Sequence, residues 1–338
     1  MPDNYDAHKE LEAFLSEWRS SDSCLTVHTS GSTGVPKPLR VEKRRMEASA
    51  RMTCRFLGLT SQDTALLCMP LRYIAGKMVV VRSLVAGMQI LNVKPCSRPL
   101  ASLDKVPTFA AMVPLQVACS VENGGDLAKL RSIRNLIIGG GAIDEKLADI
   151  LRGFPNAVWS TYGMTETLSH IAMRRISGRD ADEYYSPLPG IKVWLNAASC
   201  LCIEAPQLVD GVLETHDVAE FAPDGQRFRI LGRIDNVIDS GGIKIQAEEV
   251  ERLARPLAPF PFAVTSRYDS KLGEAVAMVV EAEPGEGTDR LLSLFKKKLE
   301  EVLPHYWLPR SYIAVPSIPK AGNGKIARAE LKKMVNAF

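Results

Sequence analysis

Long apolar runs are absent from this sequence. No stretch approaches the roughly 18 uncharged residues that a membrane-spanning helix needs, and the first residues are polar and acidic rather than a basic segment followed by an apolar one. A large excess of one charge is absent too, because the formal net charge is +3 and the lysines and arginines are spread along the chain. We therefore expect a cytoplasmic protein with no membrane insertion and no nucleic-acid partner, and a homodimer is left open.

Cysteine is sparse and shows no pairing pattern. The chain has seven cysteines, an odd number, and most of them lie in apolar runs, which indicates reduced and buried thiols. Cys200 and Cys202 occupy alternate positions of a predicted strand, without a second pair or a histidine cluster near them. Zinc is therefore not an expected cofactor, and neither flavin nor nicotinamide is expected.

The remaining composition is that of a globular protein with room for two domains. The chain has 338 residues, of which 46% are hydrophobic and 24% charged. Between residues 24 and 165, short apolar runs alternate with helical periodicity, as at 42–57 and 144–151. We interpret as strands the runs at 24–28, 64–69, 88–93, 108–113, 135–138 and 157–161. This alternation predicts an α/β fold with a mainly parallel sheet and helices on both of its faces.

The pattern changes after about residue 186. Shorter strands separated by Gly, Pro and Asp turns, one of them at 222–225, predict a β-rich subdomain. A third section begins near Asp235 and comprises a hairpin around 240–242, a helix from Ala247, strands at 262–268 and 274–283, a basic helix at 291–302 and a helix after Gly324. We therefore predict a large domain at 1–234 and a small α+β domain at 235–338.

The most informative segment is 28–37, which reads His-Thr-Ser-Gly-Ser-Thr-Gly-Val-Pro-Lys and follows a predicted strand. Its glycines let the backbone turn tightly against a ligand, while its hydroxyl groups, exposed amides and Lys37 suit phosphate oxygens. It is not a Walker A motif, because the glycine and lysine spacing differs. A phosphate-binding loop is the favoured interpretation, and a Ser/Gly surface turn is the alternative.

This segment resembles the phosphate loop of the adenylate-forming superfamily, which includes acyl-CoA synthetases, peptide-synthetase adenylation domains and luciferases. Three more segments follow in that family's order: Ser-Thr-Tyr-Gly-Met-Thr-Glu-Thr at 160–167, Thr-His-Asp at 215–217 with Leu-Gly-Arg-Ile-Asp at 231–235, and Pro-Lys-Ala-Gly-Asn-Gly-Lys-Ile-Ala-Arg at 319–328. Four segments in one order identify the chain as a member. Members usually carry a longer segment before the phosphate loop, which implies that a front subdomain is shortened or absent here.

The resemblance implies roles for individual residues. Tyr162 would pack near adenine, Thr165 would contact the α-phosphate, and Glu166 would help to hold Mg²⁺ on ATP; read alone, Thr165 and Glu166 also suit the start of a capped helix. Asp217 would bind the ribose hydroxyls, although His216 replaces the usual glycine before it. The implied ATP- or AMP-binding residues are Thr29, Ser30, Gly31, Ser32, Thr33, Gly34, Lys37, Gly139, Gly140, Gly141, Tyr162, Gly163, Asp217 and Arg233.

The last of the four segments implies a catalytic lysine. Glycines on both sides of Asn323 favour a turn that projects Lys325, whose ammonium can neutralise the charge that develops between a carboxylate and the α-phosphate. In the family this lysine drives adenylation together with Thr165 and Glu166, whereas in isolation such a loop would more often be structural. Asp235 matches the hinge about which the small, mobile domain turns. Gly241 and Gly242 would then edge the tunnel for the CoA thiol.

The implied reaction has two steps at one site. The carboxylate of an acid attacks the α-phosphorus of Mg-ATP to give acyl-AMP and diphosphate, and the thiol of CoA then takes the acyl group. The resemblance thus implies an AMP-forming acid–CoA ligase, with Mg²⁺ as the cofactor that accompanies ATP and CoA as a co-substrate.

The acid is suggested by a weaker resemblance. Residues 69–77, with Arg-Ser-Leu at 82–84, resemble a pattern of the o-succinylbenzoate–CoA ligases of menaquinone synthesis, with Tyr73 and Ala75 in place of a histidine and a serine. An aromatic keto diacid needs an apolar slot and cationic or hydroxyl donors for its distal carboxylate. The acyl-pocket candidates are therefore Tyr73, Lys77, Arg82, Ser169 and His170.

Several alternatives stay open at this point. Lys77 and Arg82 would equally suit the exposed face of a helix. The enzyme could activate another aryl or acyl acid, or pass its adenylate to a carrier protein instead of CoA. Outside enzymes, the chain could be a degenerate nucleotide-binding module without catalysis, although the retained Lys325 argues against that.

Overall fold

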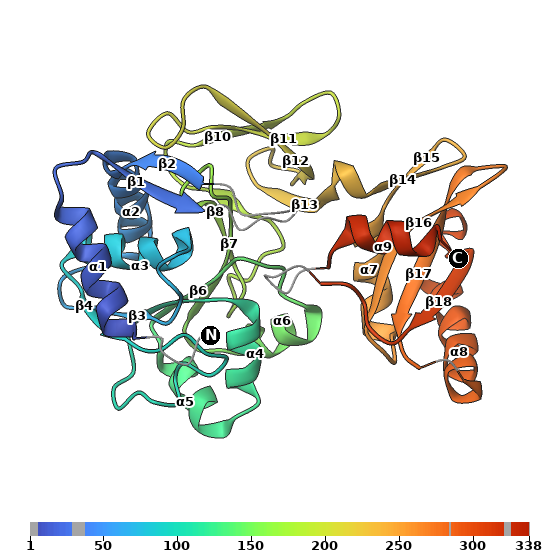
Figure 1. The fold of residues 1–338 in the computed structure, drawn as a ribbon, viewed down its shortest axis with the longest axis horizontal. Helices are drawn as coiled ribbons and strands as arrows, with labels where there is room; N and C mark the ends of the chain where they lie inside the picture. The colour runs from blue at the N-terminus through green and yellow to red at the C-terminus, as the bar shows by residue number, and fades with distance from the viewer. Residues whose placement is uncertain (1–5, 29–37, 284, 321–325, 338) are drawn as a thin grey trace.

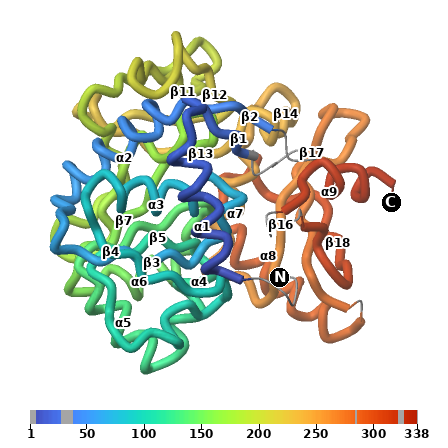
Figure 2. The backbone as a smooth tube through the Cα atoms, turned by 60° about the vertical axis from the view of Figure 1, so that its left-hand side comes forward, coloured from blue at the N-terminus to red at the C-terminus, as the bar shows by residue number. Residues whose placement is uncertain are grey.

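The computed structural model describes residues 6–28, 38–283, 285–320 and 326–337. A large body holds the first two thirds of the chain, and a smaller body formed by the C-terminal part lies beside it (Figures 1 and 2). None of the described helices is long and apolar enough to cross a membrane.

The large body is built on a sheet with the strand order β4-β3-β5-β6-β7-β8-β9. Its strands are β3 (Thr64–Leu67), β4 (Gln89–Asn92), β5 (Phe109–Met112), β6 (Asn135–Ile138), β7 (Ala157–Gly163), β8 (His170–Arg175) and β9 (Ser186–Pro187). The pairings from β4 to β7 are parallel, whereas β8 and β9 are added antiparallel. β5 and β6 are buried along their whole length, as strands covered on both faces must be. The predicted mainly parallel sheet is confirmed.

Helices cover both faces of this sheet (Figure 1). They are α1 (Ala7–Arg19), α2 (Lys43–Leu57), α3 (Ile74–Ala86), α4 (Pro114–Val121), α5 (Gly124–Ser132) and α6 (Glu145–Arg152). The chain moves outward from β3 to β4 in one direction and from β5 through β6 to β7 in the other. Because parallel crossovers are right-handed, α3 lies on one face and α4, α5 and α6 lie on the opposite face. The order therefore reverses between β3 and β5, which is where ligands bind in open α/β sheets.

The first predicted strand is placed differently from what we expected. β1 (Cys24–His28) pairs antiparallel with β2 (Pro38–Glu42) in a separate two-stranded ribbon, not in the parallel sheet. Leu25 and Val27 are buried while Thr26 between them is exposed, so only one side of the strand packs on the core. Such alternation is typical of an antiparallel ribbon and not of a strand covered on both faces.

A β-rich section follows the large sheet, as predicted. It is an antiparallel sheet in the order β10-β11-β12-β13, formed by β10 (Lys192–Leu195), β11 (Cys200–Glu204), β12 (Val212–Phe221) and β13 (Phe228–Arg233). The predicted turn at 222–225 joins β12 to β13. Asp217 and Arg233 are register partners in this pair of strands, so the ladder itself brings the two charged residues together.

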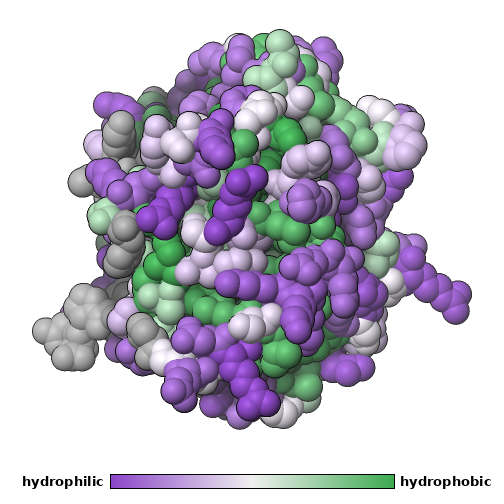
Figure 3. Space-filling model, turned by 90° about the vertical axis from the view of Figure 1, so that its right-hand side faces the viewer, coloured by the Kyte–Doolittle hydropathy of each residue, from purple (hydrophilic) through white to green (hydrophobic). Residues whose placement is uncertain are grey.

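The small body is an α+β unit. Its elements are η1 (Ile234–Asn236), β14 (Val237–Ser240), β15 (Ile243–Gln246), α7 (Ala247–Ala254), η2 (Arg255–Leu257), β16 (Phe262–Asp269), β17 (Gly273–Glu281), α8 (Glu286–Val302), η3 (His305–Trp307), β18 (Ser311–Val315) and α9 (Arg328–Val335). β14, β15, β16 and β17 are antiparallel neighbours, and β18 runs parallel to β17. The face of this body that Figure 3 shows mixes polar and apolar side chains.

The buried apolar residues fall into separate clusters. The largest cluster begins at Phe14 and ends at Phe228. Two smaller clusters, one with Ile238 and the other with Val335, draw only on residues of the small body. Among the described residues, therefore, no buried apolar cluster continues across η1.

Candidate active site

Several of the predicted site residues that the structure describes lie at the carboxyl ends of the parallel strands. β6 runs into Gly139, Gly140 and Gly141, and the adjacent β7 ends at Tyr162 and Gly163. Because neighbouring parallel strands end at the same edge of a sheet, the glycine turn and the aromatic residue share one crevice. This edge is where the fold predicts a ligand site.

Two glycines in this edge permit close backbone approach. A Cβ atom at Gly139 would lie 2.4 Å from Thr161 Oγ1, and Gly140 has a φ of 80°. A Cβ atom at Gly163 would lie 2.2 Å from the carbonyl oxygen of Ser169. A side chain at Gly163 would meet the backbone of Ser169 and His170 and push it away, whereas one at Gly139 would meet the hydroxyl of Thr161.

Residues 164–169 form a tight turn between β7 and β8, so the alternative of a capped helix start is wrong. Thr167 holds this turn, because its hydroxyl lies 2.8 Å from the carbonyl oxygen of Ser169 and 3.1 Å from the backbone nitrogen and oxygen of Met164. Thr165 is buried, whereas Glu166 is exposed. A single exposed carboxylate fits Mg²⁺, which is usually held by phosphates and water with one or two carboxylates. No group of three or more His, Cys, Asp or Glu in the described ranges could hold a metal ion.

A polar cluster joins the large sheet to the β-rich section. The hydroxyl of Tyr162 donates to Asp217 Oδ2 at 2.7 Å, and Arg233 donates to Asp217 at 3.3 Å and to Asp235 at 2.8 Å. His216 Nδ1 lies 3.1 Å from both carboxylate oxygens of Asp235. Burial and the neighbouring Asp217 raise the pKa of Tyr162, so its hydroxyl remains a donor. The structure therefore brings the predicted Tyr162, Asp217 and Arg233 together with the predicted hinge residue.

Arg82 on α3 is a buried cation. Its side chain donates to Ser169 Oγ, and its Nε has no hydrogen-bond partner in the described part of the chain. Only 2% of the residue is exposed, so the alternative of an exposed helix residue is wrong for Arg82. Burial lowers the pKa of Arg82 to about 10, which leaves it charged at neutral pH. No carboxylate forms an ion pair with it within the ranges that the structure describes.

His170 is buried beside this arginine. Its Nδ1 lies 3.4 Å from Ser169 Oγ and its Nε2 lies 2.9 Å from Thr53 Oγ1 on α2. Burial, and then the charge of Arg82, hold the pKa of His170 well below its usual range. Thr53 was not predicted from the sequence. The available signal was a hydroxyl residue on the face of α2 that also buries Met46, Ala50 and Leu57.

The other two acyl-pocket candidates have different neighbours. Lys77 is also buried, so the exposed-face alternative is wrong here too. Its ammonium lies 3.4 Å from Glu17 and 4.9 Å from the ring centre of Phe14, both on α1. Tyr73 is the residue before α3, and its ring lies 4.7 Å from the guanidinium of Arg72. No hydrogen bond found in the described chain joins Lys77 or Tyr73 to Arg82, Ser169 or His170.

The predicted hinge and CoA residues lie at the start of the small body. Asp235 is in η1, between the two sheets that flank it. Gly241 and Gly242 form the turn of the β14–β15 hairpin with φ of 62° and 85°, values that favour glycine. The remaining predicted residues, Thr29, Ser30, Gly31, Ser32, Thr33, Gly34, Lys37 and Lys325, lie outside the described residues.

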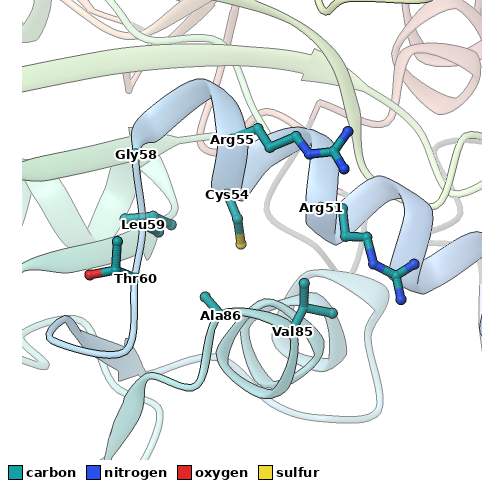
Figure 4. Close-up of a pocket in the computed structure, with 8 residues that line it drawn as sticks. All are labelled: Arg51, Cys54, Arg55, Gly58, Leu59, Thr60, Val85 and Ala86. Carbon is teal, nitrogen blue, oxygen red and sulfur yellow. The ribbon is translucent and has the colours of Figure 1, made fainter.

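A surface cavity of about 350 Å³ lies elsewhere, between the last turns of α2 and α3. Figure 4 shows Cys54 pointing from α2 toward α3, with the two arginines on α2 at the side. Its lining residues are Arg51, Cys54, Arg55, Gly58, Leu59, Thr60, Val85 and Ala86. None of the predicted site residues is among them, so this cavity is not part of the candidate active site.

Comparisons with known proteins found relatives that align with nearly the whole chain. The family model described as AMP-binding enzyme matches residues 3–200. The 2-succinylbenzoate–CoA ligase of Salmonella typhimurium is 30% identical over 345 aligned residues, which cover 97% of this chain and 72% of that protein. The ligase of the same description from Listeria monocytogenes is 27% identical, with 96% of this chain and 73% of that protein covered.

Solved structures share the fold. An acyl-CoA synthetase (AMP-forming)/AMP-acid ligase II-like protein from Dyadobacter fermentans is 30% identical, with a TM-score of 0.66 and with 99% of this chain and 96% of that chain covered. The o-succinylbenzoate CoA synthetase of Bacillus subtilis in complex with an acyl-adenylate intermediate has a TM-score of 0.76 at 23% identity, with 91% and 68% of the two chains covered. At that identity, the second likeness concerns the fold alone.

Proposed function

The chain belongs to the family of AMP-binding enzymes, and from that premise we propose that it joins o-succinylbenzoate to CoA. ATP activates the acid as an acyl-adenylate, and the products are o-succinylbenzoyl-CoA, AMP and diphosphate, a step of menaquinone biosynthesis. Relatives named 2-succinylbenzoate–CoA ligase align with nearly the whole chain, which supports an AMP-forming acid–CoA ligase.

The single observation that carries the choice of acid is the buried guanidinium of Arg82. A buried charge without a partner is unfavourable by several kcal/mol. Within the described residues, the Ser169 hydroxyl is the one side-chain partner of the Arg82 guanidinium, and Nε has none. A diacid keeps one carboxylate when the other reacts, and that carboxylate can accept from a guanidinium through two parallel hydrogen bonds. A monocarboxylic acid would leave the guanidinium unpaired.

We assign the nucleotide to the edge formed by the glycine turn, Tyr162 and the Asp217 cluster. Asp217 already accepts hydrogen bonds from Tyr162 and Arg233, so it is a preformed acceptor for ribose hydroxyls. Thr165 would contact the α-phosphate, and Glu166 would hold Mg²⁺. The metal would supply neutralisation of phosphate charge and orientation of the leaving diphosphate.

The two bodies would serve the two steps in turn. In this proposal residues 1–234 hold the acid and the nucleotide, and residues 235–338 carry Lys325, which neutralises the charge between carboxylate and phosphate during adenylation. A turn about Asp235 would then withdraw Lys325 and bring Gly241 and Gly242 to the path of the CoA thiol. The separate buried clusters on the two sides of η1 support this division.

Diphosphate release over a panel of acids tests the proposal. With ATP and Mg²⁺ present, o-succinylbenzoate should release diphosphate, and AMP with acyl-CoA should accumulate only when CoA is added. Benzoates and fatty acids should react poorly, because neither supplies a second carboxylate to Arg82. A reaction with those acids but not with the diacid would contradict the narrow assignment. If the acyl-adenylate forms but CoA does not react with it, transfer to a carrier protein is favoured. If no acid causes ATP to be consumed, a nucleotide-binding module without catalysis is favoured.

The ribose assignment makes its own prediction. Asp217→Asn should raise the KM for ATP by about 10- to 100-fold, because a charge-assisted hydrogen bond is lost, and leave the KM for the acid nearly unchanged. Tyr162→Phe is the matched control, since it keeps the ring and removes only the hydroxyl that donates to Asp217. Initial rates at saturating acid measure both variants. An Asp217→Asn enzyme with the ATP dependence of the unaltered protein would rule the assignment out.

A further inference from the structure

A chain of buried and partly buried hydrogen bonds runs from Arg82 on α3 to Thr53 on α2. Arg82 donates to Ser169 Oγ, Ser169 Oγ lies 3.4 Å from His170 Nδ1, and His170 Nε2 lies 2.9 Å from Thr53 Oγ1. Thr53 Oγ1 in turn donates to the carbonyl oxygen of Ser49, one turn earlier in α2, at 3.2 Å. Thr53 is 0% exposed and His170 is 6% exposed, so water does not compete for the two bonds that Thr53 makes.

The Thr53 end of this chain fixes its direction. Thr53 has one hydroxyl hydrogen and gives it to the Ser49 carbonyl, which can only accept, so Thr53 accepts from His170 Nε2–H. The neutral imidazole then offers an acceptor at Nδ1. Ser169 then gives its hydroxyl hydrogen to His170 Nδ1, and His170 carries its own hydrogen on Nε2 and gives it to Thr53. This is one defined tautomer of the neutral imidazole.

We propose that Thr53 and His170 are positioning residues that orient Ser169, and through it Arg82, to receive the carboxylate of the acid that does not react. The inference rests on the function proposed above. Because His170 takes the hydroxyl hydrogen of Ser169, a lone pair of that oxygen stays directed at Arg82. The guanidinium is thereby held at one nitrogen, while its buried Nε has no hydrogen-bond partner in the described chain.

The charges around the chain agree with this role. His170 faces Arg82 from α3, Ser169 from the β7–β8 turn and Thr53 from α2, and none of these is a carboxylate. A proton on His170 Nδ1 would reverse its bond to Ser169 and add a second buried cation next to Arg82. The neutral imidazole orients the serine without neutralising the arginine, so the guanidinium keeps its full attraction for a carboxylate.

The test is Thr53→Val, which keeps the shape of the side chain and removes its hydroxyl. The Nε2–H of His170 then loses its acceptor, the opposite tautomer becomes as favourable, and Ser169 loses its fixed orientation. We expect kcat/KM for o-succinylbenzoate to fall roughly tenfold, through KM. The KM for ATP should not change, and neither should the rate with the analogue of o-succinylbenzoate that lacks the carboxylate that does not react. Thr53→Ser, which restores a hydroxyl, should recover the diacid rate.

Ser49→Ala is the matched control, because the Ser49 hydroxyl is buried on the same helix without a hydrogen-bond partner in the described chain and its carbonyl remains. It should leave the ratio of diacid to analogue rates unchanged. If Thr53→Val keeps that ratio, or lowers all rates alike, the positioning role is overturned. If Thr53→Val does not fold, Thr53→Ala removes the same hydroxyl, and the same change in the ratio of diacid to analogue rates is expected. Failure of the proposed function is distinct, since the unaltered protein would then not prefer the diacid at all.

Discussion

Replacing Lys325 by alanine is expected to slow adenylate formation by about 100- to 1,000-fold, the range seen when one group that stabilises transition-state charge is removed. Thioester formation from supplied acyl-adenylate should stay nearly unchanged, because in the proposed cycle the small body has turned and this lysine has left the site before CoA reacts. Diphosphate release measures the first step, and acyl-CoA production from supplied o-succinylbenzoyl-AMP measures the second.

Lys320→Ala is the control for this prediction. Lys320 lies in the same C-terminal segment, is more than half exposed, and has its ammonium 3.9 Å from Glu281, so its loss should cost less than about 1 kcal/mol of stability and should not impair either step. An equal loss of both steps in Lys325→Ala would contradict the assigned role, and so would unaltered diphosphate release.

The second large effect is expected for Arg82→Met. Removing one partner of a buried charge pair reduces binding by about 2–5 kcal/mol, which corresponds to a rise of roughly 30-fold or more in the KM for o-succinylbenzoate. The same change should leave the melting temperature equal or higher, because it replaces a buried cation that has no carboxylate partner in the described structure with an apolar side chain of similar length. Steady-state kinetics and thermal unfolding measure the two effects separately.

Lys77→Met controls for the loss of a buried cation from the same helix. Lys77 is paired with Glu17, so its loss should lower stability and leave the KM for the acid within about twofold, a change of less than 0.5 kcal/mol. If instead Lys77→Met raises the KM for the acid and Arg82→Met does not, the carboxylate site has been assigned to the wrong cation. A destabilised Arg82→Met would mean that the guanidinium contributes to folding.

The fold could be predicted from the sequence where burial on both faces leaves a continuous apolar run. β5 and β6 are of this kind, and so their pairing in a parallel sheet was predictable. β1 is also short and apolar, but it buries only alternate residues and pairs with β2. A sequence of five residues does not distinguish a strand of the parallel sheet from a strand of such a ribbon, because the partner of a strand is set by distant parts of the chain.

The site residues were predictable where they lie in contiguous motifs. They were less predictable where the packing of a helix determines which of its side chains face the site. Tyr162 and Asp217 come from separate motifs and meet in one hydrogen bond. Lys77 and Arg82 lie five positions apart on α3, where every residue from Gly76 to Ser83 is buried, so no polar stripe reveals which lysine or arginine faces which neighbour. Thr53 was missed because its role exists only once α2 lies against His170.

The separation of the buried apolar clusters at η1 also determines which contacts a rotation of the two bodies would break. Such a motion would break polar contacts across the junction, such as that of Arg252 with Glu145 at 3.9 Å, while the clusters on each side stay intact. Water can replace exposed ion pairs at little expense, whereas wetting a hydrocarbon interior is unfavourable in proportion to its area. Successive ligands therefore need only small differences in affinity between the two arrangements to drive the swing in either direction.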